Sequence, residues 1–356
     1  MARRLRQRVA KVGAVVLVVG LGLGAAGAAE SDPGAQAALP YEIPVLVVKY
    51  FPVKGDRIDR SVTGDWGETL DFTRTKTERI TRTLAAALEE GSRFRAYKDP
   101  TARPSLKYTI VGTREFLEPL PTVPRPGHKV PCTGYDRIME RINIRDWVET
   151  RGVKEVWLWG YHGGRVVLWE SNMAGPFGDI SNSNRDPNDL PVLKKTYTVY
   201  HYNYQRGPSE ACENHMHQIE HVLNHVDGRD RTPPAKWGDL LFWGKFVGSD
   251  ASHKIVRPGC GWTHYPPNGE RDYDWANKRY VPSDIEDWKP DGTGRTQPLN
   301  CDRWAGDSLR WFIYWMQSLP GADSGLVHDG KPLRNWWAFI GDFDRAMAGG
   351  RTLCEP

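Results

Sequence analysis

The sequence predicts an α/β or α+β fold, in which a mixed sheet carries one long polar helix and an aromatic second lobe closes over it. Three observations lead to this prediction. Short apolar runs typical of buried strands alternate with segments of helical periodicity in the first part of the chain. One later segment has the start, the stop and the spacing of a long helix. The chain also contains 15 Trp, which concentrate in its later part.

The chain begins with a segment typical of a secretory signal. A basic start is followed by an apolar run, and residues 26–28 are small enough for cleavage. We therefore expect a signal peptide over residues 1–29, a linker over residues 30–42 and a secreted mature protein. The alternative is a retained N-terminal anchor. No later apolar run is long enough to cross a bilayer, so no membrane span is expected after signal removal.

Charge and cysteine content limit the function further. The net charge of +4 comes largely from the N-terminal segment, so the mature chain is near neutral. Such a balance argues against a dedicated nucleic-acid binder. The five Cys fit an exported chain with up to two disulfides and one remaining thiol, and the sequence does not fix their pairing. We expect the partner to be an extracellular polymer.

The first elements follow the order of an α/β unit. Residues 43–51 form a continuous apolar run, which predicts a buried strand. Residues 75–90 have apolar side chains at helical spacing and end before Gly91, and residues 105–112 predict a second strand. A strand, a helix and a strand in succession are typical of an α/β fold.

The next segments lead to the polar helix. We expect a helix over residues 135–150, and then a β-hairpin made of residues 154–160 and 165–171. A long loop rich in small residues follows, of the kind that often carries function. An aromatic strand over residues 196–204 then delivers the chain to the helix.

The last part of the chain is aromatic. Residues 260–275 read as a loop that places His264 beside several rings, and Trp-rich helices are expected over residues 308–319 and 335–347. We expect this part to pack as a second lobe against the first. The predicted parts are a signal peptide, a linker, an α/β lobe and an aromatic lobe, over residues 1–29, 30–42, 43–230 and 231–356.

The helix predicted over residues 209–227 is the candidate functional site. Pro208 and Ser209 supply its start and Gly228 its stop. One stripe of this helix is apolar, and the stripe beside it is polar. The polar stripe consists of Glu213, His217, Glu220, His221, Asn224 and Asp227. A solvated face normally includes Lys or Arg, and this helix has neither, so we interpret the polar stripe as a site.

The leading hypothesis is a divalent metal centre. His217 and His221 stand one helical turn apart, the spacing at which two imidazoles share a cation. We predict that they bind zinc or another divalent metal, with Glu220 or Glu213 as the base that takes a proton from bound water. The candidates for the third ligand are Asp227, His225, His201 and His264.

Two other hypotheses need no metal. Glycoside cleavage requires two carboxylates that face the scissile bond, and Glu213 and Glu220 are candidates, with Glu170 as a substitute for either. His217 would then be a neutral orienting group, and indole rings would stack on sugars. The third hypothesis is a structural surface protein whose polar stripe is an internal hydrogen-bond network. The candidate substrate-binding residues are Glu170, Asn172, Tyr202, Arg206, Trp262, His264 and Asn335.

The order of elements resembles the N-terminal lobe of zincin metallopeptidases, in which an active-site helix follows a mixed sheet. On that resemblance residues 165–171 would be the edge strand that pairs with an extended substrate. Zincins carry His-Glu-x-x-His, whereas this helix carries His217, Glu220 and His221 in the inverted order that resembles inverzincins. Inverzincins take a third ligand from a later helix, but residues 293–300 here form a loop with Gly and Pro, so the resemblance covers one helix only.

A second resemblance covers more of the chain. Residues 88–100, 169–176, 203–207 and 260–275 resemble segments of large exported bacterial proteins of uncharacterised function. This resemblance implies an extracellular setting and a single unit over residues 43–345, and it supplies no reaction. From the metal-centre hypothesis and the extracellular setting together, we expect an exported, metal-dependent hydrolase that acts on peptide or on cell-wall polymer.

Overall fold

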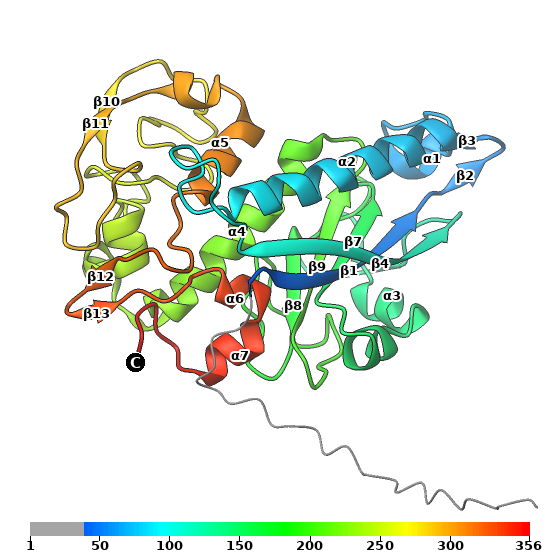
Figure 1. The fold of residues 1–356 in the computed structure, drawn as a ribbon. Helices are drawn as coiled ribbons and strands as arrows, with labels where there is room; N and C mark the ends of the chain where they lie inside the picture. Colours follow the sequence, from blue (N-terminus) through cyan, green and yellow to red (C-terminus); the bar gives the residue numbers. More distant parts are fainter. Residues whose placement is uncertain (1–38) are drawn as a thin grey trace, which may run out of the picture. The chain divides into compact units, whose positions relative to one another are not determined.

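The structure is a computed structural model that describes residues 39–356, all of which belong to one compact unit (Figure 1). The predicted signal peptide and most of the predicted linker lie outside the described residues. The fold is mixed α/β, as predicted, and its centre is a five-stranded sheet of order β4-β1-β7-β9-β8. These strands are β1 (Tyr41–Tyr50), β4 (Leu106–Phe116), β7 (Glu155–Gly160), β8 (Ser171–Ala174) and β9 (Tyr197–Asn203). The division of the chain into two lobes near residue 230 stays a prediction.

Seven α-helices occur in the described part of the chain. They are α1 (Arg60–Thr63), α2 (Leu70–Gly91), α3 (Tyr135–Arg141), α4 (Pro208–Val226), α5 (Ser308–Met316), α6 (Ala338–Gly341) and α7 (Phe343–Ala348). Four small ribbons complete the fold: β2 (Val53–Lys54) with β3 (Arg57–Ile58), β5 (Thr122–Val123) with β6 (Cys132–Thr133), β10 (Val281–Ser283) with β11 (Gln297–Leu299), and β12 (Val327–His328) with β13 (Lys331–Pro332).

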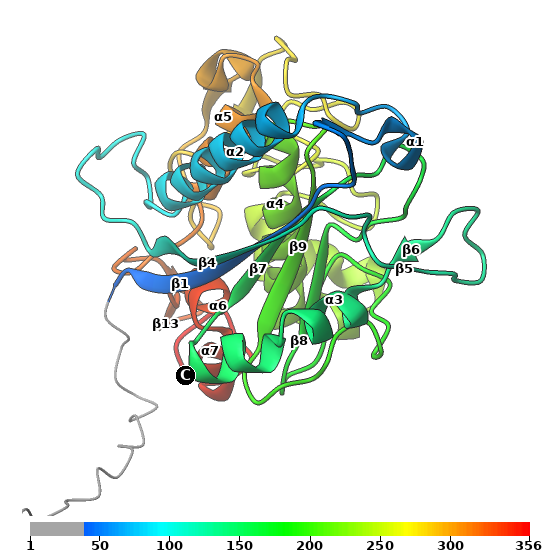
Figure 2. The same cartoon turned by 90° about the vertical axis from the view of Figure 1, so that its right-hand side faces the viewer.

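Four strands of the central sheet run parallel, and only β8 is antiparallel. The helices α2 and α4 lie side by side over one face, and α3 lies on the other (Figure 2). Because helices cover both faces, the central strands are buried along most of their length rather than alternating between buried and exposed residues. Every residue of β7 is buried, for example.

The predicted hairpin is wrong. β7 has parallel partners on both sides, β1 and β9, so no strand directly after it can pair back. Within residues 165–170 only Val167 forms a bridge, to Cys132. The two edge strands of the sheet are β4 and β8. β8 pairs with β9, and at four residues it is shorter than the substrate-pairing strand expected over residues 165–171.

Two predicted helices are interrupted. The helix predicted over residues 135–150 ends at Arg141, because Asn143 adopts a left-handed backbone with φ 53° and the chain resumes as a π-helical turn at Asp146–Thr150. The helix predicted over residues 335–347 is split into α6 and α7 by the non-helical backbone of Asp342, with φ −151° and ψ 65°. The strand and helix predictions for β1, α2, β4, β7, β9, α4 and α5 are confirmed, with bounds that differ by several residues at some ends.

Indole N–H groups fix the 260–275 loop in place. Trp315 on α5 donates a hydrogen bond of 2.8 Å to the carbonyl oxygen of Gly261. The carbonyl oxygen of Thr263 accepts two more, from Trp275 at 3.0 Å and from Trp311 at 3.2 Å. The loop therefore has a defined path against α5 although it has no regular secondary structure.

All five cysteines are described, and each is a free thiol, so the structure does not contain the disulfides that we expected. Four of them are buried. Among the described helices, none is both long enough and apolar enough to cross a membrane.

Candidate functional site

The candidate site lies at the end of the sheet where β7 and β9 finish. In open α/β sheets, ligands bind outside the carboxyl ends of the parallel strands. Here β9 ends at Asn203 and α4 begins at Pro208. Gly207 is the N-cap residue of α4, and its backbone N–H donates a hydrogen bond of 3.1 Å to the side chain of Glu210. Because β8 is antiparallel, its first residue, Ser171, pairs with Tyr200, and the carbonyl oxygen of the preceding Glu170 accepts the backbone N–H of His201 in the second half of β9. This brings Glu170 close to the start of α4.

A cleft of about 570 Å³ opens at this end. Its walls come from the β7 and β9 ends, the first turns of α4 and the 260–275 loop. They include Glu170, Arg206, Glu210, Glu213, Tyr273 and Trp275. The size is within the range of small-molecule and substrate pockets.

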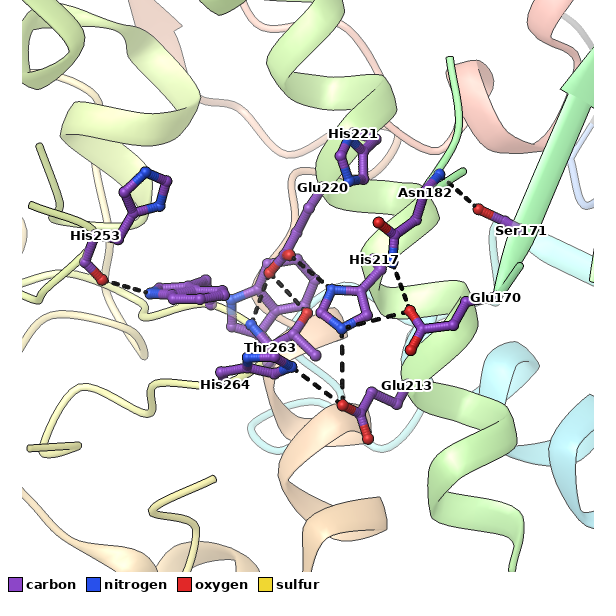
Figure 3. A network of polar contacts seen from close by, with 12 residues as sticks. Glu170, Ser171, Asn182, Glu213, His217, Glu220, His221, His253, Thr263 and His264 are labelled. Carbon is purple, nitrogen blue, oxygen red and sulfur yellow. Dashed lines mark hydrogen bonds and ion pairs between the residues drawn. The ribbon is translucent and has the colours of Figure 1, made fainter. Parts of the chain in front are cut away.

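Three side chains beside this cleft offer ligand atoms to one point. Glu213 and His217 lie one turn apart on α4, and His264 comes from the 260–275 loop. Glu213 Oε1 lies 3.1 Å from His264 Nε2 and 3.7 Å from His217 Nε2. The ligand atoms of all three residues lie within 4.8 Å of one another. Both imidazoles thus turn the same ring nitrogen toward one carboxylate oxygen (Figure 3).

A second carboxylate stands behind each imidazole. His217 Nδ1 lies 3.4 Å from Glu220 Oε2, and His264 Nδ1 lies 3.5 Å from Asp272 Oδ1. A carboxylate in this position holds the N–H of one ring nitrogen, and so leaves the other nitrogen free to bind a cation. The arrangement is the one expected around histidine ligands of a metal.

Both carboxyl oxygens of Glu220 are engaged by neighbouring residues. Its Oε1 accepts hydrogen bonds from the backbone N–H of Thr263 at 2.6 Å and from the Thr263 hydroxyl at 2.7 Å, while Oε2 faces His217. The residue is only 6% exposed. It therefore lacks the free oxygen that the predicted roles of water-activating base or sugar-cleaving acid require.

Glu170 is the accessible carboxylate of the group. Its Oε2 lies 3.9 Å from His217 Nε2 and accepts a hydrogen bond from the side chain of Asn182. About a third of its side chain is exposed, and it lines the cleft together with Glu213. Glu170 was predicted to contact substrate, and it lies in the wall of the cleft.

The carboxylates and imidazoles of the group shift one another's pKa. Burial alone would lower the pKa of His217, but the hydrogen bonds and negative charges of Glu213 and Glu220 outweigh burial and raise it. Burial would raise the pKa of Glu213, but the two imidazoles outweigh it and lower that pKa. Carboxylates outnumber imidazoles here, so the group holds a surplus of negative charge that suits a divalent cation.

His221 does not belong to this group. Its Nδ1 lies 3.2 Å from Arg185 Nη2, and Figure 3 shows the His221 ring apart from the contacts that join His217, Glu213 and His264. Burial, opposed by Glu220 and assisted by Arg185, lowers the pKa of His221 to about 4. A neighbouring guanidinium disfavours a second cation, so this geometry does not favour the predicted sharing of one metal by His217 and His221.

Of the four candidates for the third ligand, only His264 joins His217. Asp227 accepts the backbone N–H of Phe242 at 2.8 Å and caps the π-helical turn Leu241–Phe246. His225 lies 3.0 Å from Asp230 on the surface. His201 is buried, with its Nδ1 3.0 Å from the hydroxyl of Tyr135.

The predicted substrate residues separate into two groups. Glu170, Tyr202 and Arg206 line the cleft, although the Tyr202 hydroxyl is engaged by His215 at 2.6 Å. Trp262 packs 5.2 Å from the His264 ring and supports it. Asn172 is buried in β8, and Asn335 lines a separate cavity beside Tyr41.

Sequence reasoning missed three residues of the site: Thr263, Asp272 and Tyr273. All three lie in the 260–275 loop. The sequence showed that this loop is aromatic and acidic, but it gave none of the three a role in the site. Tyr273 is 54% exposed, lies 4.3 Å from the His264 ring and adopts a left-handed backbone with φ 63°. A non-glycine residue in that conformation is uncommon and is often found at functional sites.

No known protein family matches the chain, and no curated protein matches it either.

Proposed function

We propose that this protein is a secreted, metal-dependent hydrolase that cleaves amide bonds in a peptide or in the peptide part of a cell-wall polymer. One observation carries the proposal. His217 Nε2 and His264 Nε2 converge on Glu213 Oε1 beside a cleft, and each imidazole is backed by its own carboxylate. Two imidazoles and a carboxylate form a common ligand set of catalytic zinc, which keeps one position open.

Each residue of the group has a distinct task in this proposal. Glu213, His217 and His264 hold the cation, while Glu220 and Asp272 orient the two imidazoles. When bound, such a metal supplies an activated water and polarises the scissile carbonyl.

The remaining chemistry belongs to side chains of the cleft. Glu170 is accessible and lies beside His217, so it takes a proton from the attacking water and returns it to the leaving amine. The hydroxyl of Tyr273 makes no hydrogen bond within the described part of the chain, and it donates to the carbonyl oxygen as negative charge develops there.

A second candidate is metal-free cleavage of glycosides by Glu170 and Glu213. The observation in its favour is that both carboxylates face the same cleft, which Tyr202, Tyr273 and Trp275 also line. The original pair of Glu213 and Glu220 is not suitable, because Glu220 is buried and fully bonded. Most of the indole rings are also buried and have no face available for a sugar.

Metal analysis of the purified protein separates the two candidates. We expect one zinc or other divalent ion per chain, lost in His217→Ala and in His264→Ala. His221→Ala is the matched control, since it removes an imidazole of the same helix that points elsewhere, and it should keep the metal.

Activity provides the second readout. A peptide mixture analysed by mass spectrometry should show new termini that disappear with a chelator and in Glu170→Gln. A protein that retains no metal, or that loses it equally in His221→Ala, contradicts the proposed metal centre. Polysaccharide cleavage that survives the chelator supports the second candidate.

A further inference from the structure

A second cavity lies at the opposite end of the sheet from the cleft. It has a volume of about 340 Å³, and its lining residues come from the amino ends of β7 and β9, the second half of α4, and the α6 and α7 helices. Its walls are largely apolar or aromatic. They include Met173, Tyr197, Val222, Phe339 and Phe343.

Three buried polar groups face this cavity without a full set of partners. Glu155, at 4% exposure, has one carboxyl oxygen held by the indole N–H of Trp157 at 2.7 Å. Burial raises the pKa of this carboxyl group and the nearby hydroxyl of Tyr108 lowers it, but within the described residues no hydrogen bond holds the other oxygen. Gln218, at 3% exposure, donates through Nε2 to the carbonyl of Ile180, and its Oε1 is buried with no partner. The hydroxyl of Tyr200 also makes no hydrogen bond.

Buried polar atoms in native proteins are nearly always paired, so unpaired atoms that share one cavity indicate a missing ligand. A mostly apolar cavity with a few convergent polar groups is the usual form of a small-molecule site. The unpaired atoms here are mainly acceptors: an amide oxygen, a carboxyl oxygen and a phenol oxygen. They require a ligand that donates several hydrogen bonds from one point.

The charges of the cavity walls favour a cation. Lys154 and Lys195 are balanced by Asp342 and Asp344, and Glu155 is left over. The Lys154 ammonium is already engaged, since it donates to the carbonyl oxygen of Gly341. Aromatic rings in the wall also attract an organic cation through their faces.

We propose that this cavity is a binding site for a small organic ammonium ion with an apolar body. The ammonium donates to the Glu155 carboxyl group, which releases its proton to solvent as the amine binds, and also to Gln218 Oε1 and the hydroxyl of Tyr200. The apolar body packs against Phe339 and Phe343. The site is separate from the hydrolase centre and does not depend on a metal there.

The test uses three compounds of one shape and different charge. These are 2-phenylethylamine, the neutral 2-phenylethanol and the anionic phenylacetate, each titrated into the full chain by calorimetry with and without a chelator. We expect the amine to bind at least about tenfold more tightly than the alcohol, because a hydrogen bond between charged groups contributes more than one between neutral groups. Phenylacetate should not bind, and the chelator should change nothing.

Two variants locate the binding. Glu155→Gln keeps the size of the side chain and an acceptor for Trp157, and should weaken amine binding by roughly tenfold or more. Glu42→Gln is the control, because it neutralises an exposed carboxylate on β1 that pairs with Lys107. Gln218→Met provides a second, independent loss if Glu155→Gln does not fold.

Each alternative outcome overturns the proposal. Equal binding of the three compounds indicates an unselective apolar hole. Absence of amine binding, or amine binding that is unchanged in both Glu155→Gln and Gln218→Met, shows that these groups do not form an ammonium site. The proposed hydrolase is tested separately: absence of metal from the purified protein contradicts the metal centre, whereas amine binding is expected with or without metal.

Discussion

Replacement of Thr263 by Val tests whether Glu220 orients His217. Val keeps nearly the same shape, so the packing of the loop is preserved and only the hydroxyl is lost. That hydroxyl donates a 2.7 Å hydrogen bond to a carboxylate that is 6% exposed, so water cannot easily replace it. A hydrogen bond to a charged, buried acceptor contributes about 1.5–3 kcal/mol, and we expect a loss of that size in the free energy of unfolding.

The same substitution should also weaken metal binding. The backbone N–H of Thr263 still holds Glu220, so the carboxylate stays near His217 but is less firmly placed. Loss of such an outer partner typically lowers metal affinity by about 10- to 100-fold. The assays are denaturant unfolding of the chelated protein and competition for zinc against a chelator of known affinity.

Thr133→Val is the matched control. Thr133 is also fully buried, and its hydroxyl donates to the carbonyl oxygen of Val167, which takes no part in the proposed metal group. It should lose stability with unchanged metal affinity. If Thr263→Val lowers stability as Thr133→Val does and leaves metal affinity within about twofold of the wild type, Glu220 does not act through His217.

Three further predictions concern other parts of the molecule. Tyr273→Phe keeps the ring against His264 but removes the hydroxyl, so kcat should fall roughly 10- to 100-fold while metal content is unchanged. Burial raises the pKa of Glu155 from 4.5 to about 8. Between these pH values the folded chain keeps a proton that the unfolded chain loses. The free energy of unfolding should therefore fall as pH rises through this range, by up to about 1.4 kcal/mol per pH unit. Unfolding curves of Glu155→Gln should lack this fall and match the wild type near pH 4. Trp315→Phe leaves the carbonyl oxygen of Gly261 without its indole donor, so thermal unfolding should show a loss of about 1–3 kcal/mol in the free energy of unfolding. An unchanged midpoint would contradict the idea that this indole N–H holds the loop in place.

The elements that sequence predicted well are those with strong local signals. The apolar runs of β1, β7 and β9 and the capped, periodic segment of α4 depend on neighbours in the sequence. The hairpin failed because the same apolar run suits a central parallel strand and an antiparallel one, and the choice depends on distant partners. The break at Asn143 likewise has no periodic signal, since one residue in a left-handed conformation ends the helix.

The candidate site shows the same limit at the level of side chains. Helical spacing correctly placed Glu213 and His217 near each other, but it gave His221 the same weight although that imidazole points toward Arg185. A spacing of four residues fixes which side chains are neighbours and does not fix where their ring nitrogens point. The second imidazole of the group comes from His264, 47 positions further along the chain than His217, and no local pattern relates the two.

The tryptophans of the last part provide the physical link between fold and site. A loop that presents His264 and Thr263 to α4 has backbone carbonyls that no strand or helix satisfies, and these carbonyls must still be paired once buried. Tryptophan fills a core with its ring and carries one N–H donor, so it can bury the loop and satisfy a carbonyl at once. Trp275, Trp311 and Trp315 do so at two carbonyls, those of Thr263 and Gly261. These three Trp are therefore explained by the need to hold the irregular loop that carries His264, and stacking on sugars is not required to explain them.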